Sequence, residues 1–254
     1  SVPSRIVFAL AVMSKTVAGT LPMLLFIAIW WQRGRIDLRR DVLPLLPLLV
    51  CGVAAGLATA SWEREFNRTD LASFSLTPVE RLLVAGRAVV FHASKFVWPV
   101  NLTFSYPRWE IDSSQWWQYL FPLGVMGLLA VAWAIRGRSR GPLAALLFFC
   151  VSLAPTSGLF TLYTFRYTFV ADHYQYVACI GPILLTVSGL IWLSARYSLS
   201  PMVRRAGGVT ILAILAALTW VQSHDYASRE TLYRNTLIKN PESPPAPRLP
   251  WHSG

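Results

Sequence analysis

The chain is organised around one polar stretch, Val170-Ala171-Asp172-His173-Tyr174-Gln175-Tyr176-Val177-Ala178-Cys179-Ile180-Gly181-Pro182. Apolar runs flank it, Leu143–Leu153 before and Val177–Leu193 after. A carboxylate, an imidazole and two phenols thus meet at the mouth of a predicted membrane helix. Ionisable groups in such a place are costly unless they form a site or find partners. The alternative is an interfacial aromatic belt, with Tyr174 and Tyr176 at the level of the lipid headgroups.

Composition places the chain among membrane proteins. Of its 254 residues, 54% are hydrophobic and 14% are charged, whereas soluble domains carry about 25% charged residues. Several apolar runs are long enough to cross a bilayer. The formal net charge of +11 would suggest nucleic-acid binding in a soluble protein. Here the basic residues cluster in short loops between apolar runs, as the positive-inside bias predicts, so we expect no nucleic-acid partner.

The apolar pattern predicts an all-α, polytopic transmembrane bundle of about six spans plus one interfacial helix. The predicted spans are Ile6–Trp31, Val42–Ala60, Tyr119–Ile135, Leu143–Tyr163, Tyr176–Ala195 and Gly207–Gln222. Three short loops between them hold ten arginines: Arg33, Arg35, Arg39, Arg40, Arg136, Arg138, Arg140, Arg196, Arg204 and Arg205. We therefore place these loops inside and the Asp172 stretch outside.

The segment Val79–Trp98 is apolar but is interrupted by Arg81, Arg87, His92 and Lys95. Thr77-Pro78-Val79-Glu80 is typical of a helix start, with proline in the first turn. If this helix spanned the membrane, the basic loop at residues 136–140 would lie outside, against the orientation rule. We expect an amphipathic, basic helix that is interfacial or re-entrant.

Other features refine this outline. Lys15 lies inside the first predicted span and must face a cavity, an acidic partner or an anionic headgroup, or extend to the interface. Pro22 should kink or unwind that helix.

Residues 1–222 form the predicted membrane domain, and residues 223–254 form an extracytoplasmic tail in which His224–Asn240 is helical. Cys51, Cys150 and Cys179 lack paired spacing, so we expect free thiols and no metal site.

Four stretches carry a family resemblance. They are Ser14-Lys15-Thr16-Val17-Ala18-Gly19-Thr20-Leu21-Pro22; Lys95-Phe96-Val97-Trp98-Pro99 followed by Tyr106-Pro107; Ala171-Asp172-His173-Tyr174-Gln175-Tyr176 with Ile180-Gly181; and Leu232–Pro241. In this order and spacing, the chain resembles the membrane region of bacterial tetratricopeptide-repeat proteins related to the TMTC-type O-mannosyltransferases, which have the GT-C glycosyltransferase architecture. His173 stands where the family usually has arginine.

The resemblance implies a partial GT-C domain, its C-terminal half, in a multi-pass protein of the bacterial inner membrane. The acidic catalytic loop of the family would precede Ser1, and tetratricopeptide repeats would follow the tail, so we expect a fragment truncated at both ends. The implied reaction moves a sugar from a polyprenyl-phosphate carrier to a protein or other hydroxyl acceptor on the outer face. No tightly bound cofactor is expected.

This reaction needs a base for the acceptor hydroxyl and cationic or hydrogen-bonding groups for the departing phosphate. Candidate partners of the lipid phosphate or the sugar are Lys15, Lys95, Arg166, His173, Tyr174 and Tyr176. Asp172 is a candidate second acid or a structural partner of one of the cations. Two other functions stay open: a non-catalytic membrane scaffold that presents repeats to protein partners, and a transporter of lipid-linked sugars, which predicts internal repeats and paired broken helices.

Overall fold

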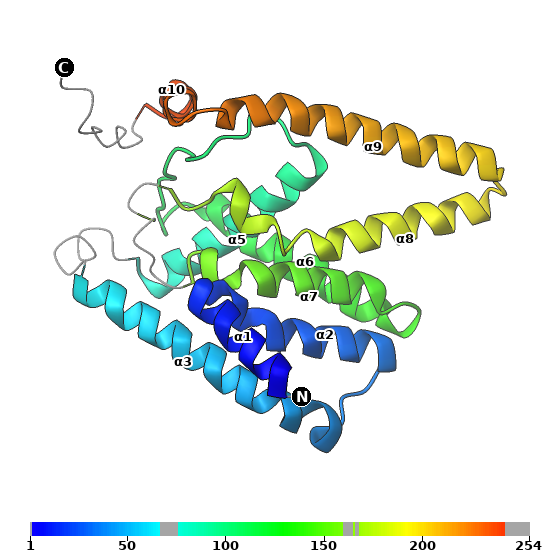
Figure 1. The fold of residues 1–254 in the computed structure, drawn as a ribbon, viewed down its shortest axis with the longest axis horizontal. Helices are drawn as coiled ribbons and strands as arrows, with labels where there is room; N and C mark the ends of the chain where they lie inside the picture. The colour runs from blue at the N-terminus through cyan, green and yellow to red at the C-terminus, as the bar shows by residue number, and fades with distance from the viewer. Residues whose placement is uncertain (1, 67–75, 160–164, 166–167, 242–254) are drawn as a thin grey trace.

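The computed structural model describes residues 2–66, 76–159, 165 and 168–241, and these residues form helices and connecting loops without a strand (Figure 1). The longer helices are α1 (Val2–Ser14), α2 (Leu21–Arg33), α3 (Leu43–Phe66), α5 (Pro78–Val97), α6 (Leu120–Ala134), α7 (Gly141–Leu153), α8 (Ile180–Arg196), α9 (Pro201–Ser223) and α10 (Arg229–Lys239). The all-α fold predicted from the sequence is confirmed.

Three helical segments in the described part of the chain are long and apolar enough to cross a membrane: Leu38–Trp62, Trp116–Gly137 and Pro201–Tyr226. Val17–Arg33, Gly141–Thr156 and Ile180–Arg196 are apolar but shorter. A membrane protein is therefore supported, whereas six full spans are not established. Two predicted spans are longer than the helices in the structure. Helix α7 ends at Leu153 and is followed by a short 3-10 turn, Ala154–Thr156. Helix α8 begins at Ile180 rather than at Tyr176.

The segment Ile6–Trp31 is not one continuous helix, and this prediction was wrong. The chain breaks after Ser14, forms a 3-10 turn at Thr16–Thr20, and turns back into α2 (Figure 1). Pro22 occupies the first turn of α2, where its missing N–H costs no helical hydrogen bond. Lys15 thus lies at a turn between two helices rather than in the middle of a span.

Helix α5 begins as its sequence predicts. The Thr77 side chain accepts a hydrogen bond from the Glu80 amide, and the Glu80 carboxylate accepts one from the Thr77 amide, which forms a capping box. One face of the helix, including Leu83, Val84 and Ala88, is buried within the protein. Whether α5 spans the membrane or lies at its surface stays a prediction.

The basic side chains of α5 are accommodated by aromatic rings. The Arg87 guanidinium carbon lies 4.5 Å from the centre of the Trp109 ring and 5.6 Å from that of Phe121. Lys95 Nζ lies 5.6 Å from the Phe91 ring centre. Such cation–π contacts stabilise charges that are partly removed from water, which explains how an apolar helix carries these cations.

Close packing at Gly181 joins α7 and α8. A β-carbon built on Gly181 would lie 2.6 Å from the Ala145 carbonyl oxygen. The residue must therefore be small for the two helices to approach as they do. Small residues at such contacts are typical of membrane helix pairs.

Replacing Gly181 with alanine should lower the free energy of unfolding by about 1–3 kcal/mol, because overpacking forces the backbones of α7 and α8 apart. Gly189→Ala in the same helix is the matched control, since its added carbon meets no atom within 4 Å. It should be neutral or slightly stabilising, because alanine favours the helix. Denaturant unfolding in detergent micelles measures both. Equal losses in the two variants would contradict the packing role of Gly181.

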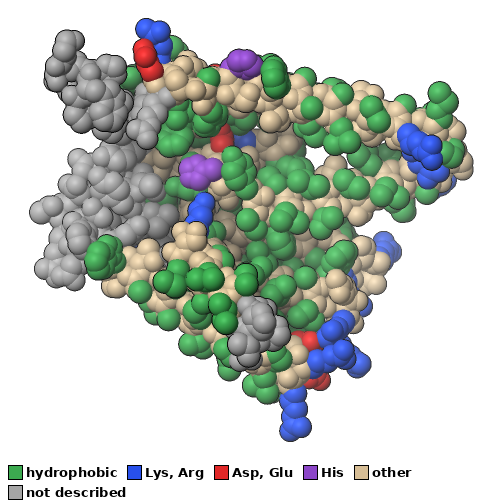
Figure 2. Space-filling model, in the orientation of Figure 1, with side chains coloured by type: hydrophobic (Ala, Val, Ile, Leu, Met, Phe, Trp, Pro, Cys, Tyr) green, Lys and Arg blue, Asp and Glu red, His purple; other side chains and the backbone are tan. Residues whose placement is uncertain are grey.

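Helix α8 packs on α7, whereas α9 lies apart from the rest of the bundle. The two helices diverge from their connecting turn at residues 197–200 (Figure 1), and no residue of α9 is buried. That turn lies at the same end of the bundle as the α2–α3 and α6–α7 loops, and basic side chains gather there (Figure 2). We call this the arginine end. The three basic loops predicted to share one side do lie at one end, and which end faces the cell interior stays a prediction.

Candidate functional site

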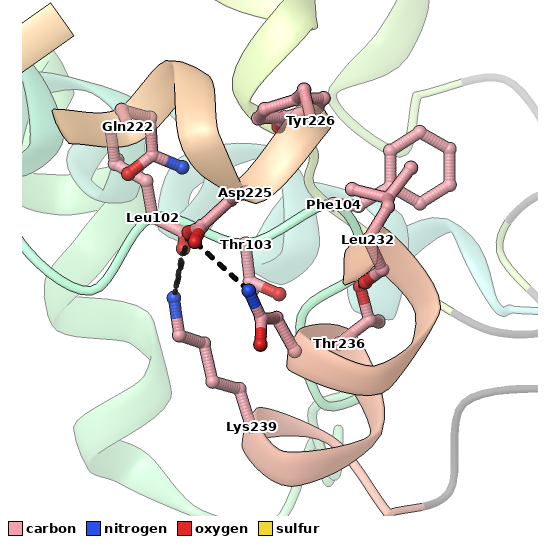
Figure 3. Close-up of a pocket in the computed structure, with 10 residues that line it drawn as sticks. Leu102, Thr103, Phe104, Gln222, Asp225, Tyr226, Leu232, Thr236 and Lys239 are labelled. Carbon is pink, nitrogen blue, oxygen red and sulfur yellow. Dashed lines mark hydrogen bonds and ion pairs between the residues drawn. The ribbon is translucent and has the colours of Figure 1, made fainter. Parts of the chain in front are cut away.

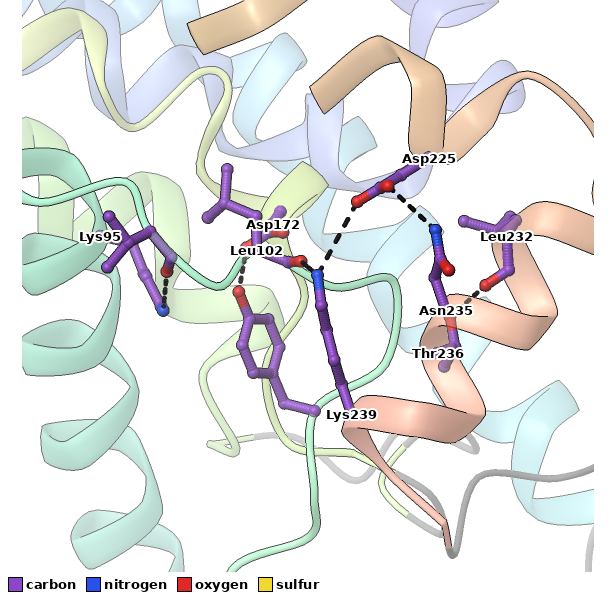
Figure 4. A network of polar contacts seen from close by, with 10 residues as sticks. Lys95, Leu102, Asp172, Asp225, Leu232, Asn235, Thr236 and Lys239 are labelled. Atoms are coloured by element: carbon purple, nitrogen blue, oxygen red, sulfur yellow. Dashed lines mark hydrogen bonds and ion pairs between the residues drawn. The ribbon is translucent and has the colours of Figure 1, made fainter. Parts of the chain in front are cut away.

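The polar stretch of the sequence lies at the opposite end, which we call the site end. Asp172–Gln175 forms a short 3-10 turn that precedes α8. The Tyr106 hydroxyl donates a 2.8 Å hydrogen bond to Asp172 Oδ1 (Figure 4). Asp172 Oδ2 and Gln175 Oε1 are buried and receive no hydrogen bond from the described residues. Asp172 is thus held through one oxygen, while its other oxygen is buried and unpaired among the described residues.

Both predicted lysines act on this turn. Burial raises the pKa of Asp172, and the charge of Lys95 lowers it. Burial and the charge of Lys15 both lower the pKa of His173. Lys95 Nζ donates a 2.7 Å hydrogen bond to the Val100 carbonyl (Figure 4) and lies 5.4 Å from the Tyr106 ring centre. An ammonium group has three donors, so this contact leaves Lys95 able to bind an anion.

The aromatic members of the stretch differ in their surroundings. The His173 ring is exposed, stacks on Phe104 with 6.4 Å between ring centres, and meets Tyr174 edge-on at 4.6 Å. Tyr176 is 75% exposed, as an interfacial belt residue would be. On the face in Figure 2, acidic, basic and histidine side chains lie together between the α9–α10 arm and the α1–α3 layer. Arg166, also predicted for the site, lies outside the described residues.

Helix α10, in the C-terminal tail, packs against the loop that follows α5 at the site end. Lys239 Nζ donates to the Leu102 carbonyl at 2.7 Å and lies 3.7 Å from Asp225 Oδ2, and Asn235 Nδ2 donates to Asp225 Oδ1 at 2.9 Å (Figure 4). Asn240 Nδ2 lies 3.5 Å from the Ser105 carbonyl. These contacts fix the segment Leu102–Tyr106, which we call the strap.

A small pocket lies between the strap, the turn His224–Tyr226 and helix α10. Phe104 and Tyr226 border it on one side, and Asp225 and Lys239 border it on another (Figure 3). Burial, and then the negative charges of Asp172 and Tyr176, raise the pKa of Tyr226. The pocket therefore adjoins the Asp172 turn through Tyr226 and the strap.

The environment favours the neutral forms of the central groups. Partial burial raises the pKa of the Asp172 carboxyl above its ordinary value, and the Tyr106 hydroxyl and the Lys95 charge oppose this shift. Burial and then the Asp172 charge raise the pKa of Tyr106, so this phenol remains a donor. Burial and the Lys15 charge lower the pKa of His173. His173 is therefore neutral near pH 7 and does not serve as a fixed cation.

The raised pKa of Asp172 predicts a pH-dependent stability. A carboxyl with a higher pKa in the folded than in the unfolded state stabilises the fold below its ordinary pKa of about 4 and loses that contribution as pH rises through the folded pKa. Asp172→Asn keeps an oxygen acceptor for Tyr106 and removes this titration. Thermal unfolding from about pH 4 upward should show the wild type losing stability relative to the variant. If the stability of the wild type and of the variant changed in parallel with pH, the raised pKa of Asp172 would be contradicted.

Several residues of the site were not among those predicted. Tyr106 holds Asp172, and Asp225, Lys239 and Asn240 fasten the strap. A signal was present, because Tyr106 belongs to the Tyr-Pro pair of the second resemblance stretch and Lys239-Asn240 to the fourth. The partners of Tyr106, Lys239 and Asn240 lie 66 to 137 residues away along the chain, so residue type alone did not indicate their contacts.

Chemically, the Asp172 turn brings together the Asp172 carboxyl and the Tyr106 phenol, with Lys15 and Lys95 acting on it, beside the ends of apolar helices. This set can hold an anionic group and the hydroxyls attached to it. Comparisons with protein-family models, with curated proteins and with solved structures find no match for this chain.

Proposed function

We propose that the chain is part of an integral-membrane glycosyltransferase that moves a sugar from a polyprenyl-phosphate carrier to a hydroxyl acceptor at the site end. One observation carries the proposal: a half-buried carboxyl, Asp172, is held by Tyr106 on one oxygen within the electrostatic field of Lys95, and the charge of Lys15 acts on the neighbouring His173. A lipid phosphate leaving group needs positive charge, and a sugar needs directed acceptors. The residues present match both requirements.

The roles follow from the chemistry of each group. Lys15 and Lys95 stabilise the negative charge that develops on the departing phosphate. Tyr106 fixes the Asp172 carboxyl, and this carboxyl positions the neighbouring groups that face the sugar. The base that deprotonates the acceptor is assigned to an acidic group outside these residues, as the family resemblance implies. His173, being neutral, contributes a hydrogen bond rather than a charge.

A transfer assay tests the proposal. Membranes containing the full-length protein are given radiolabelled mannosyl polyprenyl phosphate, and the label that leaves the lipid fraction for protein or another hydroxyl acceptor is counted. We expect release that depends on the protein. No protein-dependent release with mannosyl, glucosyl or galactosyl carriers would overturn the transferase and favour the scaffold.

A further inference from the structure

Two basic loops meet at the arginine end, where the start of α7 lies beside the end of α2 (Figure 1). The Arg140 guanidinium lies over Gly34, in the space that a side chain at position 34 would take. Arg140 Nη1 also donates a 3.5 Å hydrogen bond to the Trp31 carbonyl in the last turn of α2. Direct contact therefore joins residues 33–42 to residues 135–140, and we call these two segments the joined loops.

The acidic residues of the joined loops are already bound within the protein. Asp41 is 5% exposed and pairs with Arg33 at 2.5 Å. Asp37 Oδ1 accepts hydrogen bonds from the backbone amides of Arg39 and Arg40, each at 2.9 Å. The joined loops hold seven arginines and these two aspartates, which gives a net charge of +5. Most of this positive charge therefore has no acidic partner among the described residues.

Several guanidinium groups of the joined loops are available to a ligand. The exposed groups that make no hydrogen bond to any described residue are those of Arg35, Arg39, Arg40 and Arg138. Arg140 has five N–H donors and uses one of them for the Trp31 carbonyl. A guanidinium group binds a phosphate through two parallel N–H bonds. Each of the two loops can therefore hold a phosphate group.

Apolar side chains lie among these arginines and indicate the kind of ligand. Ile36 and Leu38, within the first loop, are 45% and 66% exposed. Trp31 and Trp133, which directly precede the two loops, are 44% and 54% exposed, and tryptophan is enriched at the level of lipid headgroups. An acidic protein or a nucleic acid would satisfy the charges alone. A phospholipid, whose phosphate lies directly above its acyl chains, satisfies both the arginines and the apolar side chains.

We propose that the joined loops bind a phospholipid that carries two phosphate groups, as cardiolipin does. One phosphate lies against Arg35 and Arg39, and the other lies against Arg138 and Arg140. Two phosphates linked in one molecule bind two arginine groups more tightly than two separate lipids do, because the first contact raises the effective concentration for the second. Basic surfaces at the ends of membrane helices are suited to such headgroups. The inference does not depend on the proposed transferase, since these arginines lie at the end opposite the Asp172 turn.

A lipid titration tests the site. The full-length protein, purified in a mild detergent, is titrated with cardiolipin, and the bound lipid is counted by native mass spectrometry. We expect one cardiolipin molecule to be retained per protein, and much weaker retention of phosphatidylglycerol, which is anionic but carries one phosphate. Inositol hexakisphosphate, a soluble polyanion, should bind about tenfold more weakly than cardiolipin, because it makes no apolar contacts.

Matched pairs of variants locate the site. Arg138→Gln combined with Arg140→Gln should weaken cardiolipin binding about 25-fold, from about fivefold for each positive charge that is lost beside the headgroup. Arg204→Gln combined with Arg205→Gln removes the same charge at the same end of the bundle, from exposed positions of α9. This control should change binding by less than about twofold, because salt screens charges that do not touch the lipid.

The other loop provides a second, independent variant. Arg35→Gln combined with Arg39→Gln should weaken binding as much as the α6–α7 pair does, and it decides the question if that pair fails to fold. Arg138→Lys combined with Arg140→Lys keeps the charge but removes the two parallel donors, so it should recover only part of the binding.

Three results would overturn the proposal. Equal losses in the α9 control and in the joined-loop variants would assign binding to the general positive charge of the arginine end. Equal retention of phosphatidylglycerol would remove the requirement for two phosphates. Equal binding of inositol hexakisphosphate would make the partner a soluble polyanion rather than a lipid.

Discussion

Replacing Lys95 with alanine should lower sugar transfer about a hundredfold, the scale seen when one charge-stabilising group is removed from an active site. The charge of Lys95 lowers the pKa of Asp172, against the effect of burial, and its ammonium group donates a hydrogen bond to the Val100 carbonyl. The ammonium group is therefore already positioned to bind the phosphate. Lys15→Ala and Asp172→Ala should also lower transfer far more than they lower protein abundance. The rate is measured in membranes with radiolabelled mannosyl polyprenyl phosphate, and abundance is measured by immunoblot.

The controls separate charge from folding. Arg204→Ala removes one exposed positive charge at the arginine end and should leave transfer unchanged. Lys95→Arg keeps the charge with a different geometry and should retain part of the rate, with the loss in kcat rather than KM. If Lys15→Ala and Asp172→Ala both transferred sugar at the wild-type rate, these residues would have only structural roles.

Replacing His92 with alanine should lower the free energy of unfolding by about 3 kcal/mol, through a cavity and the loss of a buried hydrogen bond. The imidazole is 1% exposed, with Nδ1 at 2.8 Å from the Ala88 carbonyl and Nε2 at 3.3 Å from the Ala171 carbonyl. A neutral imidazole has one N–H, so it donates to one of these oxygens at a time. It joins α5 to the residue that directly precedes Asp172, and sugar transfer should fall as well.

His92→Gln provides the test of this contact, because its amide can donate to the same carbonyl. It should lose less stability than the alanine variant and recover part of the transfer. Ser94→Ala, at an exposed position of the same helix, should change stability by less than about 0.5 kcal/mol. Denaturant titration in micelles measures all three. A glutamine variant as unstable as the alanine variant would assign the effect to packing alone.

The helical class followed from the sequence because long apolar runs have few alternatives to a helix in a membrane. The start of α5 was predicted correctly, since Thr77 and Glu80 form a local capping box that depends only on neighbouring residues. The break at Lys15–Thr20 was only half anticipated. Pro22 indicated a kink, but the reversal of the chain depends on how α1, α2 and α3 pack, including the close approach of Gly19 to Gly52.

The candidate site was predicted less completely than the fold. Asp172 and His173 stood out because polar residues in an apolar setting are conspicuous, and Lys15 and Lys95 stood out for the same reason. Tyr106 and Asn240 did not, because they lie in segments where polar and aromatic residues are common. Their contacts join residues that are 66 and 135 positions apart, which a pattern of local spacing cannot indicate.

The strap contacts also determine when the site can form during synthesis. Hydrogen bonds of Lys239 to Leu102 and of Asn240 to Ser105 close loops of 137 and 135 residues. Contacts of such long range form late, since the chain between them must be ordered first. Because domains are made from the N-terminus onward, all the apolar helices reach the membrane before Asn240 leaves the ribosome. The strap is therefore the last part of the site to be secured, and a nascent chain that stops short of α10 would hold its helices without a finished site.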